Sequence, residues 1–165
     1  MIPSKKSWTR NLPNKSLISD QDIDFMQQAL GLAQTHKGQT GDNPSVGCVL
    51  VKNGKVVGKA VTAKGGRPHA ETQALKMAGH DTRGATAYVT LEPCSHKGQT
   101  GPCAVALIKA GISRCVIAAI DPDPRVNWRG AAMLQEAGID TQVGLLSERA
   151  VKIMDDFFKR VRDRS

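Results

Sequence analysis

Long apolar runs, aromatic residues and cysteines are all scarce in this sequence of 165 residues. Its longest apolar runs, such as C-V-I-A-A-I at 115–120, are far shorter than the roughly 20 residues that cross a bilayer, and the amino-terminal segment lacks the apolar stretch of a secretory signal. Four cysteines are too few for a disulfide scaffold, and they suit a metal site or buried thiols in a reducing compartment. We therefore expect a cytoplasmic protein of one domain without membrane contact.

The net charge of +8 is concentrated at the two ends of the chain. Residues 1–19 hold four basic residues and no acidic one, and residues 148–165 hold six basic residues against four acidic ones. Aromatic residues make up 4% of the chain and do not alternate with these basic residues, as they do on surfaces that stack nucleic-acid bases. We interpret the charges as solvated ends, and nucleic acid is not the expected partner.

Composition and periodicity divide the chain into three parts. Residues 1–19 contain two prolines and no apolar period, which predicts a flexible arm. Residues 20–146 carry the pattern of a folded domain, which starts with a capped helix at 20–37. Residues 147–165 are predicted to form a C-terminal helix from Ser147 to about Arg162.

The order of elements within the domain predicts its fold class. Apolar segments at 46–52 and 55–61 flank Asn53 and Gly54, the strongest short signal for an antiparallel hairpin. Helices and strands then alternate, with helices at 69–79, 103–111 and 129–138 and strands at 86–91, 114–120 and near 139–145. This order predicts an α/β protein, a three-layer α/β/α sandwich with a mixed sheet of about five strands. Ligands gather at strand ends in such sheets, so the loops 63–71, 92–103 and 121–128 are expected to converge on one site.

One histidine and two cysteines lie in these loops at positions that suit a metal site. His69 begins a helix, and Cys94 and Cys103 flank a polar loop, each directly after a proline. One imidazole and two thiolates suit Zn²⁺ and leave its fourth tetrahedral position open to water, as in catalytic zinc sites. The helix start at Cys103 also favours a thiolate. We predict that these three residues bind zinc.

Glu71 follows His69 by two residues, in the motif H-A-E. A carboxylate there cannot easily share the metal, but it can take a proton from the adjacent water and pass it on, which is general acid/base catalysis. Zinc-dependent nucleobase deaminases follow this plan, with H-x-E before P-C-x-x-C. Here eight residues separate Cys94 from Cys103 instead of two. We predict Glu71 to be the catalytic residue.

Other interpretations remain open for single residues. H-A-E or E-P-C alone is common, and a histidine at a helix start is more often a cap or a surface residue, so the prediction depends on their joint order. His96 could replace one of the cysteines as a ligand. Cys48 and Cys115 lie within apolar strand patterns, where a cysteine behaves as a small buried hydrophobe.

Six segments of the chain together resemble the deaminase domain of the bifunctional riboflavin-biosynthesis deaminase/reductase, a member of the cytidine deaminase-like superfamily. They are D-I-D-F-M-Q-Q-A-L-G-L-A, N-P-S-V-G-C-V-L-V, G-G-R-P-H-A-E-T-Q-A-L, T-L-E-P-C-S-H-K-G-Q-T-G-P-C, I-A-A-I-D-P-D-P-R-V and M-L-Q-E-A-G-I, within about 20–162. The resemblance implies that zinc-dependent hydrolysis removes the 2-amino group of a diaminopyrimidinone ribosylamino 5′-phosphate, which gives a uracil-type product and ammonia. It also implies a small phosphorylated pyrimidine as partner and a homo-oligomer.

The same resemblance implies contacts to the substrate. Asn43 would hydrogen-bond the pyrimidine ring, and His96, Asp121 and Asp123 would face the ring, the ribose or the phosphate. An amide offers a donor and an acceptor to a heterocycle, and a carboxylate suits ribose hydroxyls. Asn43 and Asp121 are equally ordinary as a turn residue and a strand exit.

Four positions depart from the family pattern, at Thr62, Gln99, Asp123 and Trp128, where the family commonly has a histidine, a basic residue, an asparagine and a glycine. Asp123 in place of asparagine adds repulsion near a phosphorylated substrate. Lys97 and Arg67 are candidates to offset that charge. The departures bear on the identity of the substrate, whereas the predicted metal ligands are unaffected.

The family usually continues into a reductase domain that uses a nicotinamide cofactor, and residues 147–165 resemble the linking helix. No G-x-G-x-x-G pattern is present, so a dinucleotide is not expected here. A protein with the deaminase domain alone and a piece of a longer protein are both compatible with this sequence. Two other functions remain open: a nucleoside or tRNA-base deaminase of the same superfamily, and a non-catalytic metal-stabilised module.

Overall fold

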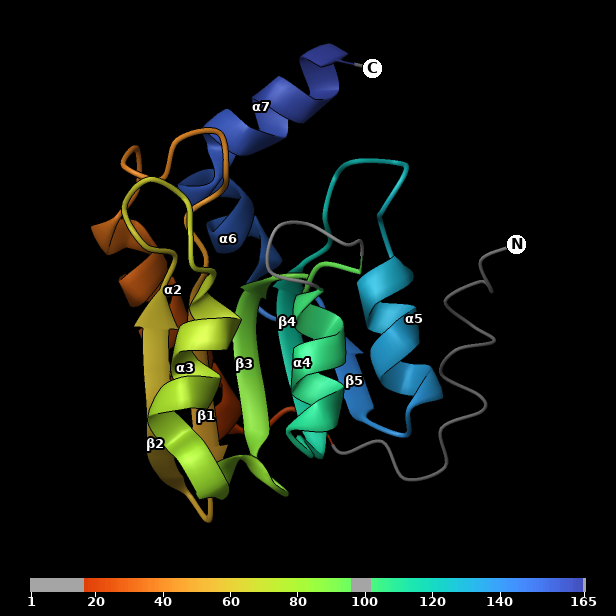
Figure 1. The fold of residues 1–165 in the computed structure, drawn as a ribbon. Helices are drawn as coiled ribbons and strands as arrows, with labels where there is room; N and C mark the ends of the chain where they lie inside the picture. Colours follow the sequence, from red (N-terminus) through yellow and green to blue (C-terminus); the bar gives the residue numbers. More distant parts are fainter. Residues whose placement is uncertain (1–16, 96–101, 165) are drawn as a thin grey trace.

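The computed structural model describes residues 17–95 and 102–164, which fold around one mixed β-sheet (Figure 1). Its strands are β1 (Gly47–Lys52), β2 (Lys55–Val61), β3 (Thr86–Leu91), β4 (Arg114–Ala119) and β5 (Asp140–Val143). They lie in the order β2-β1-β3-β4-β5, with β1 antiparallel to both neighbours and β3, β4 and β5 parallel. The predicted mixed sheet of five strands is confirmed.

The hairpin of β1 and β2 has the geometry that its turn sequence predicts. Asn53 and Gly54 both have positive φ, 52° and 77°, as a two-residue turn with the twist of a β-hairpin requires. Lys52 pairs with Lys55 directly across this turn. The turn sets the pairing next to it, and a shift of register between Leu50 and Val51 sets the pairing that brings Val61 opposite Gly47.

The central strands are buried on both faces, which explains their nearly continuous apolar sequences. In β4, the residues from Cys115 to Ala118 are fully buried, and Val89 of β3 is buried beside them. Helices cover each face of the sheet, so these strands have no polar side to present to water. They form the centre of the hydrophobic core.

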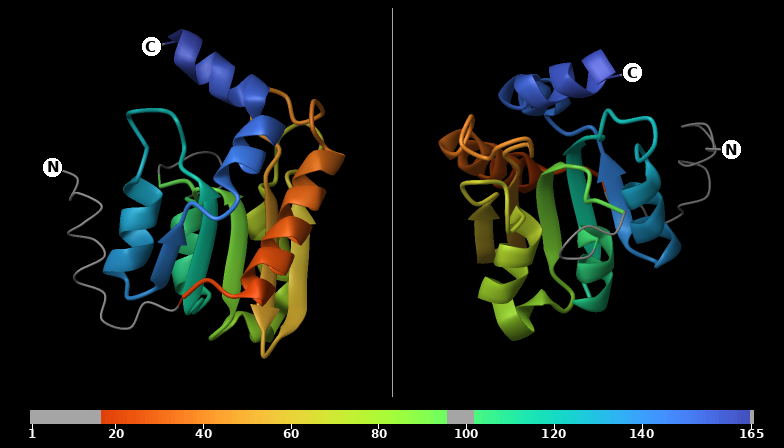
Figure 2. Two further views of the ribbon diagram at one scale, coloured as in Figure 1. Left: turned by 180° about the vertical axis from the view of Figure 1, so that it is seen from behind. Right: turned by 45° about the horizontal axis from the view of Figure 1, so that its top comes forward.

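Helices cover the two faces of the sheet as separate layers. Helices α3 (Ala70–Ala78), α4 (Cys103–Lys109) and α5 (Arg129–Glu136) lie on the face toward the viewer in Figure 1. Helices α2 (Asp20–Thr35) and α6 (Ser147–Ile153) cover the other face, which the left view of Figure 2 shows. The predicted three-layer α/β/α sandwich is thus present. Among the described residues, no helix combines the length and the apolar character needed to cross a bilayer.

A buried ionic network attaches α2 to the sheet. Asp22, 3% exposed, accepts hydrogen bonds from both terminal nitrogens of Arg114 at 2.7 and 2.9 Å and from the Tyr88 hydroxyl. It also completes a capping box, because its side chain accepts the Ser19 N–H while the Ser19 hydroxyl accepts the Asp22 N–H. The Arg114 guanidinium holds the pKa of Asp22 well below its usual range.

The single C-terminal helix predicted from Ser147 to about Arg162 is wrong. The structure has two helices, α6 and α7 (Asp155–Arg164), with a break at Met154. Ala150, Ile153 and Met154 are buried against the body of the protein, and the break turns α7 across the end of the sheet, which a straight helix could not do (Figure 1). A short 3₁₀ helix, η1 (Gly79–Thr82), also follows α3 directly and was not predicted. Most of the predicted arm lies outside the described residues.

Candidate active site

The three predicted metal ligands lie together at one end of the sheet. His69 is the N-cap residue of α3, Cys94 follows β3, and Cys103 is the first residue of α4. The Nδ1 atom of His69 is 3.4 Å from the Sγ atom of Cys103, and the Cys103 backbone N–H donates to the Cys94 sulfur at 3.1 Å. One ligand atom from each residue lies within 4.8 Å of the others.

This donor set fits a tetrahedral zinc ion. Zn–S and Zn–N bonds of about 2.3 and 2.0 Å place neighbouring ligand atoms roughly 3.5–3.8 Å apart. The 3.4 Å between His69 Nδ1 and Cys103 Sγ is close to this spacing, and all three ligand atoms lie within 4.8 Å of one another. Two sulfur ligands and one imidazole supply three of four tetrahedral positions, the number typical of a catalytic zinc site.

Of the two cysteines, Cys94 is the one whose surroundings favour a thiolate. Hydrogen bonding from the Cys103 side chain lowers the pKa of Cys94 to about 4, and the His69 side chain and the Cys103 backbone N–H act in the same direction. The same sulfur contact raises the pKa of Cys103. A divalent cation binds the deprotonated form of cysteine, so its binding would release the proton of the Cys103 thiol.

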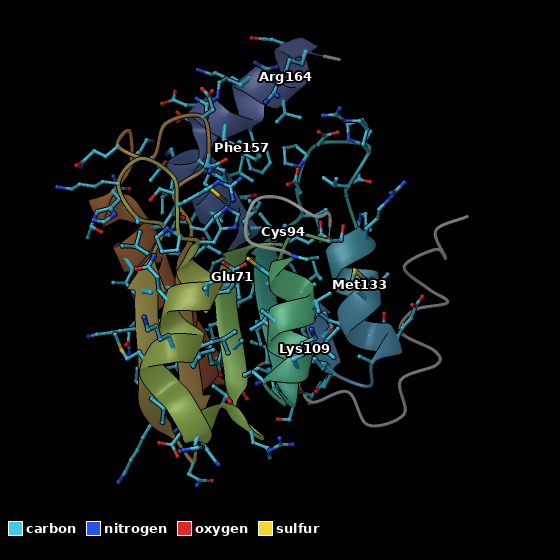
Figure 3. All side chains as sticks on the ribbon, in the orientation of Figure 1. Glu71, Cys94, Lys109, Met133, Phe157 and Arg164 are labelled. Atoms are coloured by element: carbon cyan, nitrogen blue, oxygen red, sulfur yellow. The ribbon has the colours of Figure 1, made fainter. Side chains whose placement is uncertain are left out.

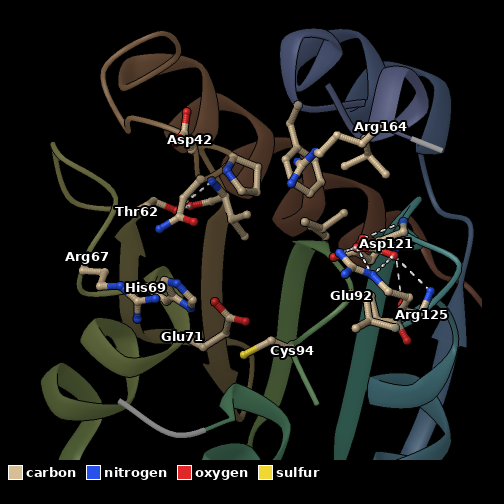
Figure 4. Close-up of a pocket in the computed structure, with 18 residues that line it drawn as sticks. Asp42, Thr62, Arg67, His69, Glu71, Glu92, Cys94, Asp121, Arg125 and Arg164 are labelled. Carbon is tan, nitrogen blue, oxygen red and sulfur yellow. Dashed lines mark hydrogen bonds and ion pairs between the residues drawn. The ribbon is translucent and has the colours of Figure 1, made fainter. Parts of the chain in front are cut away.

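Glu71 stands in the first turn of α3, beside the ligand cluster. Figure 4 shows its carboxyl group between His69 and Cys94, and it is 4% exposed. Burial raises the pKa of Glu71 to about 7. A carboxyl group with this pKa can both accept and return a proton near neutral pH.

A pocket of about 530 Å³ opens above these residues, a size that fits a small organic ligand (Figure 4). Its walls come from the segment before β1, the ends of β2, β3 and β4, and helix α7, whose Phe157 and Arg164 lie above Glu71 and Cys94 in Figure 3. The three loops that were expected to converge on one site therefore do so in their described parts.

Asn43 and Thr62 line the pocket on the side of β1 and β2. The Asn43 side-chain NH₂ group donates to the Gly66 carbonyl at 2.9 Å, and the Thr40 hydroxyl donates to the Asn43 carbonyl at 2.6 Å. The bond to Gly66 orients the side-chain amide of Asn43, and the bond from Thr40 holds the Asn43 backbone carbonyl. Thr62 is buried, and its hydroxyl accepts the Val46 N–H at 2.9 Å. This hydroxyl thus ties the residue after β2 to the residue before β1.

Glu92 is a pocket residue whose role sequence reasoning missed. It is 5% exposed, and one carboxylate oxygen accepts the N–H groups of Asp121 and Trp128 at 3.2 and 3.1 Å. The other oxygen accepts the N–H of Ala131 in the first turn of α5 at 3.0 Å. Burial raises the pKa of Glu92, and the three backbone bonds oppose that rise. The sequence does contain a signal for this role, because Glu92 is an acidic residue directly after an apolar strand, in E-P-C.

The loop after β4 presents Asp121 and Asp123 to the pocket, as predicted, but the charge of Asp123 is paired. Arg125 donates to both carboxylate oxygens of Asp123, with the shortest contact at 2.7 Å from its Nη2 atom. This pairing lowers the pKa of Asp123 to about 2. Among the described residues, Arg125, two positions along the chain, offsets the charge of Asp123. The sequence had suggested Lys97 or Arg67 for this role, and Lys97 lies outside the described residues.

Trp128 occupies a backbone conformation that favours glycine. Its φ is 67°, in the left-handed region, and it is the N-cap residue of α5. The bond from its N–H to Glu92 stabilises this conformation. The resemblance had implied a glycine at this position, and the backbone gives the physical reason.

The remaining predicted residues fall into two groups. His96, Lys97 and Gln99 lie outside the described residues. Cys48 and Cys115 are fully buried in β1 and β4, as expected of core thiols, and burial raises the pKa of both.

The chain is similar to known deaminases and riboflavin biosynthesis proteins. Residues 19–119 match the model of the cytidine and deoxycytidylate deaminase zinc-binding region. Riboflavin biosynthesis protein RibD of Haemophilus influenzae is 54% identical over 145 residues, which cover 88% of this chain and 39% of that protein. A diaminohydroxyphosphoribosylamino-pyrimidine deaminase of Buchnera aphidicola subsp. Schizaphis graminum is 44% identical over 142 residues, with 86% of this chain and 97% of the relative covered.

A solved structure has the same fold. Acinetobacter baumannii RibD superposes with a TM-score of 0.83 and 46% sequence identity, over 86% of this chain and 40% of that one. The chain therefore spans about two fifths of the length of both RibD proteins.

Proposed function

Because the chain belongs to the family of zinc-binding cytidine and deoxycytidylate deaminases, we propose that it hydrolyses the amino group of a phosphorylated ribosylaminopyrimidine in riboflavin biosynthesis. The observation that carries the proposal is the position of the buried Glu71 carboxyl beside a His-Cys-Cys cluster, at the floor of a pocket of small-molecule size. A relative of similar length, 44% identical, is named for this reaction.

His69, Cys94 and Cys103 would hold the zinc ion. When bound there, zinc supplies a Lewis acid that makes a water molecule a nucleophile near neutral pH. The hydrogen bond from the Cys103 N–H and the amino end of α4 stabilise negative charge on the Cys94 sulfur. The chain thus provides ligands that are already ordered by the starts of α3 and α4.

Glu71 would move the protons of the reaction. Its carboxylate accepts a proton from the attacking water and delivers protons to the ring nitrogen and to the departing amino group. Water adds to the amino-bearing carbon, the carbon–nitrogen bond breaks, a carbonyl forms, and ammonia leaves. Burial, which brings the pKa of Glu71 to about 7, suits a group that must be both base and acid.

Other pocket residues would orient the pyrimidine. Asn43, whose amide is fixed by the Gly66 carbonyl, offers a donor and an acceptor to the ring edge. Asp121, which follows β4 and lies across the pocket from Thr62 in Figure 4, suits the ribose hydroxyls. Phe157 of α7 lies above the pocket in Figure 3, Val161 of the same helix also lines it, and both would keep bulk water from the ring.

Substitution of Glu71 by glutamine tests the assignment. We expect Glu71→Gln to keep stoichiometric zinc but to lose about a hundred- to ten-thousandfold of kcat, because glutamine cannot exchange protons. Ammonia release and metal content are measured on the same preparation. Loss of zinc in this variant would show that Glu71 is a ligand and that its assigned role is wrong.

The choice of substrate separates the proposal from its alternatives. Ammonia release is compared for the diaminopyrimidine ribosylamino phosphate, cytidine and tRNA. Turnover of cytidine or tRNA alone would favour a nucleoside or tRNA-base deaminase. No turnover of any of the three by zinc-loaded protein would favour a non-catalytic module.

A further inference from the structure

We propose that Arg125 and Arg164 form an anion-binding subsite at the end of the pocket opposite His69, and that this subsite receives the phosphate group of the substrate. The inference rests on the proposed function for the identity of the ligand. It adds two residues to the site, one from the loop after β4 and one from helix α7.

The Arg125 side chain is held in place by its neighbour. Asp123 accepts hydrogen bonds from the Nε and Nη2 atoms of Arg125 and also from the Arg125 backbone N–H at 3.0 Å. A guanidinium group has five N–H donors, so a side chain that uses two of its nitrogens on a carboxylate keeps donors for a second anion. Its high exposure, 79%, leaves that second face open to a ligand from the pocket.

Arg164 reaches the same place from helix α7. It lines the pocket with Arg125, and its positive charge contributes to the lowered pKa of Asp123, after the larger contribution of Arg125. The helix that carries it is fastened across the pocket, because Arg160 donates to the Asp42 carbonyl at 3.0 Å and Val161 is buried. Two guanidinium groups therefore share one side of the pocket (Figure 4).

The distribution of charge in the pocket leaves few places for a phosphate. Glu71 occupies the floor and Glu92 the wall below Asp121, and an anion close to these acids would be repelled. Arg67 also lines the described part of the pocket, but it lies beside His69 (Figure 4).

The geometry of the reaction selects between these two positions. The amino-bearing ring carbon must meet Glu71, and the ribose separates the ring from the phosphate in the proposed substrate. The phosphate therefore belongs at the side of Arg125 and Arg164, away from His69 and Arg67 (Figure 4). Bidentate guanidinium contacts are the common protein partner of a phosphate group.

The test compares a phosphorylated and a dephosphorylated substrate. Arg125→Gln and Arg164→Gln each remove a charge and keep a long polar side chain. We expect each to raise KM for the phosphorylated ribosylaminopyrimidine about tenfold or more, the order expected for a lost hydrogen bond to a charged group. KM for the dephosphorylated compound and kcat for both should stay near their original values.

Arg162→Gln is the matched control. Arg162 lies on the same helix, its side chain is 73% exposed, and it is outside the pocket lining. This variant should leave the ratio of the two KM values unchanged. An equal loss in Arg162→Gln and Arg164→Gln would mean that general charge attracts the substrate, which would overturn the subsite.

Binding of ribose 5-phosphate, measured by calorimetry, separates the subsite from the proposed reaction. We expect the original protein and Glu71→Gln to bind it, and the Arg125→Gln/Arg164→Gln double variant to lose this binding. Phosphate binding through both arginines without deamination of any pyrimidine would sustain the subsite and reject the proposed function. Deamination with a KM ratio that neither arginine affects would reject the subsite and sustain the function.

Discussion

A single buried carboxylate, that of Glu92, joins two segments of the pocket wall. It accepts backbone N–H groups from both ends of the loop 121–128 and from the first turn of α5. Gly130 allows this approach, because a Cβ atom there would lie 1.9 Å from the Pro93 carbonyl oxygen. The carboxylate therefore determines where the loop holds Asp121 and Asp123 relative to the predicted metal ligands.

We expect Glu92→Ala to lower the free energy of unfolding by about 3 kcal/mol, because one buried and two part-buried N–H groups lose their acceptor. Glu92→Gln should cost less, since one oxygen atom remains for two of these groups. Urea unfolding of the three proteins measures the difference. Equal stability of Glu92→Ala and the original protein would contradict the role assigned to this carboxylate.

The residues whose chemistry is specific could be predicted from the sequence, and those whose role depends on tertiary approach could not. His69, Glu71 and the two cysteines are recognisable because H-A-E followed by Pro-Cys and a second cysteine, in this order, is typical of zinc-dependent deaminases. Arg125 is an ordinary surface arginine until the loop after β4 folds it onto Asp123.

Among the helices and strands, the sequence predicted the β1–β2 hairpin but missed the break between α6 and α7. Asn53 and Gly54 have the positive φ angles that their types permit, so the turn was predicted at its observed place and the strand bounds to within one residue. The break at Met154 has no such signal, because residues 147–164 contain neither proline nor glycine. Packing of α6 on the sheet and of α7 over the pocket produces that break, and sequence periodicity does not describe such packing.

Helix α2 depends on the sheet through Asp22, which leads to a prediction on stability. Asp22→Asn leaves the largely buried guanidinium of Arg114 with Asp140, 3.8 Å from its Nε atom, in place of the closer Asp22 carboxylate. Loss of one partner of a buried ion pair costs about 3–5 kcal/mol, and we expect the lower end of that range here. Thermal unfolding measures the effect. Asp24→Asn, at an exposed position on the same helix, is the control and should change the stability little.

The same residue predicts a dependence on pH. The folded protein holds the pKa of Asp22 below the unfolded value of 3.8, so the carboxylate stabilises the fold above that value. This contribution is lost as the pH falls through the range below the unfolded pKa. The stability of the original protein should therefore fall on acidification more steeply than that of Asp22→Asn. If the stability of the two proteins fell equally steeply with falling pH, the ion pair of Asp22 and Arg114 would contribute nothing to the fold.

On the scale of the whole molecule, the sheet brings together segments that are distant in the sequence. The amino ends of α3 and α4 and the segment after β3 meet only because β2 and β3 both lead toward the same end of the sheet (Figure 1). A metal bound by His69, Cys94 and Cys103 would cross-link these segments. Its binding energy would be available only to the folded chain, since the unfolded chain does not hold the three ligands together.

Removal of the metal should therefore destabilise the whole domain. Zinc at a hundred times its dissociation constant stabilises a fold by about 2.7 kcal/mol, which corresponds to about 5–10 °C in Tm for a chain of this size. We expect the Tm of chelator-treated protein to be lower by this amount, and added zinc to restore it. Cys103→Ala should not respond to zinc, whereas Cys48→Ala, which removes a core thiol, should respond like the original protein. An identical zinc response in both variants would exclude the three-residue ligand set.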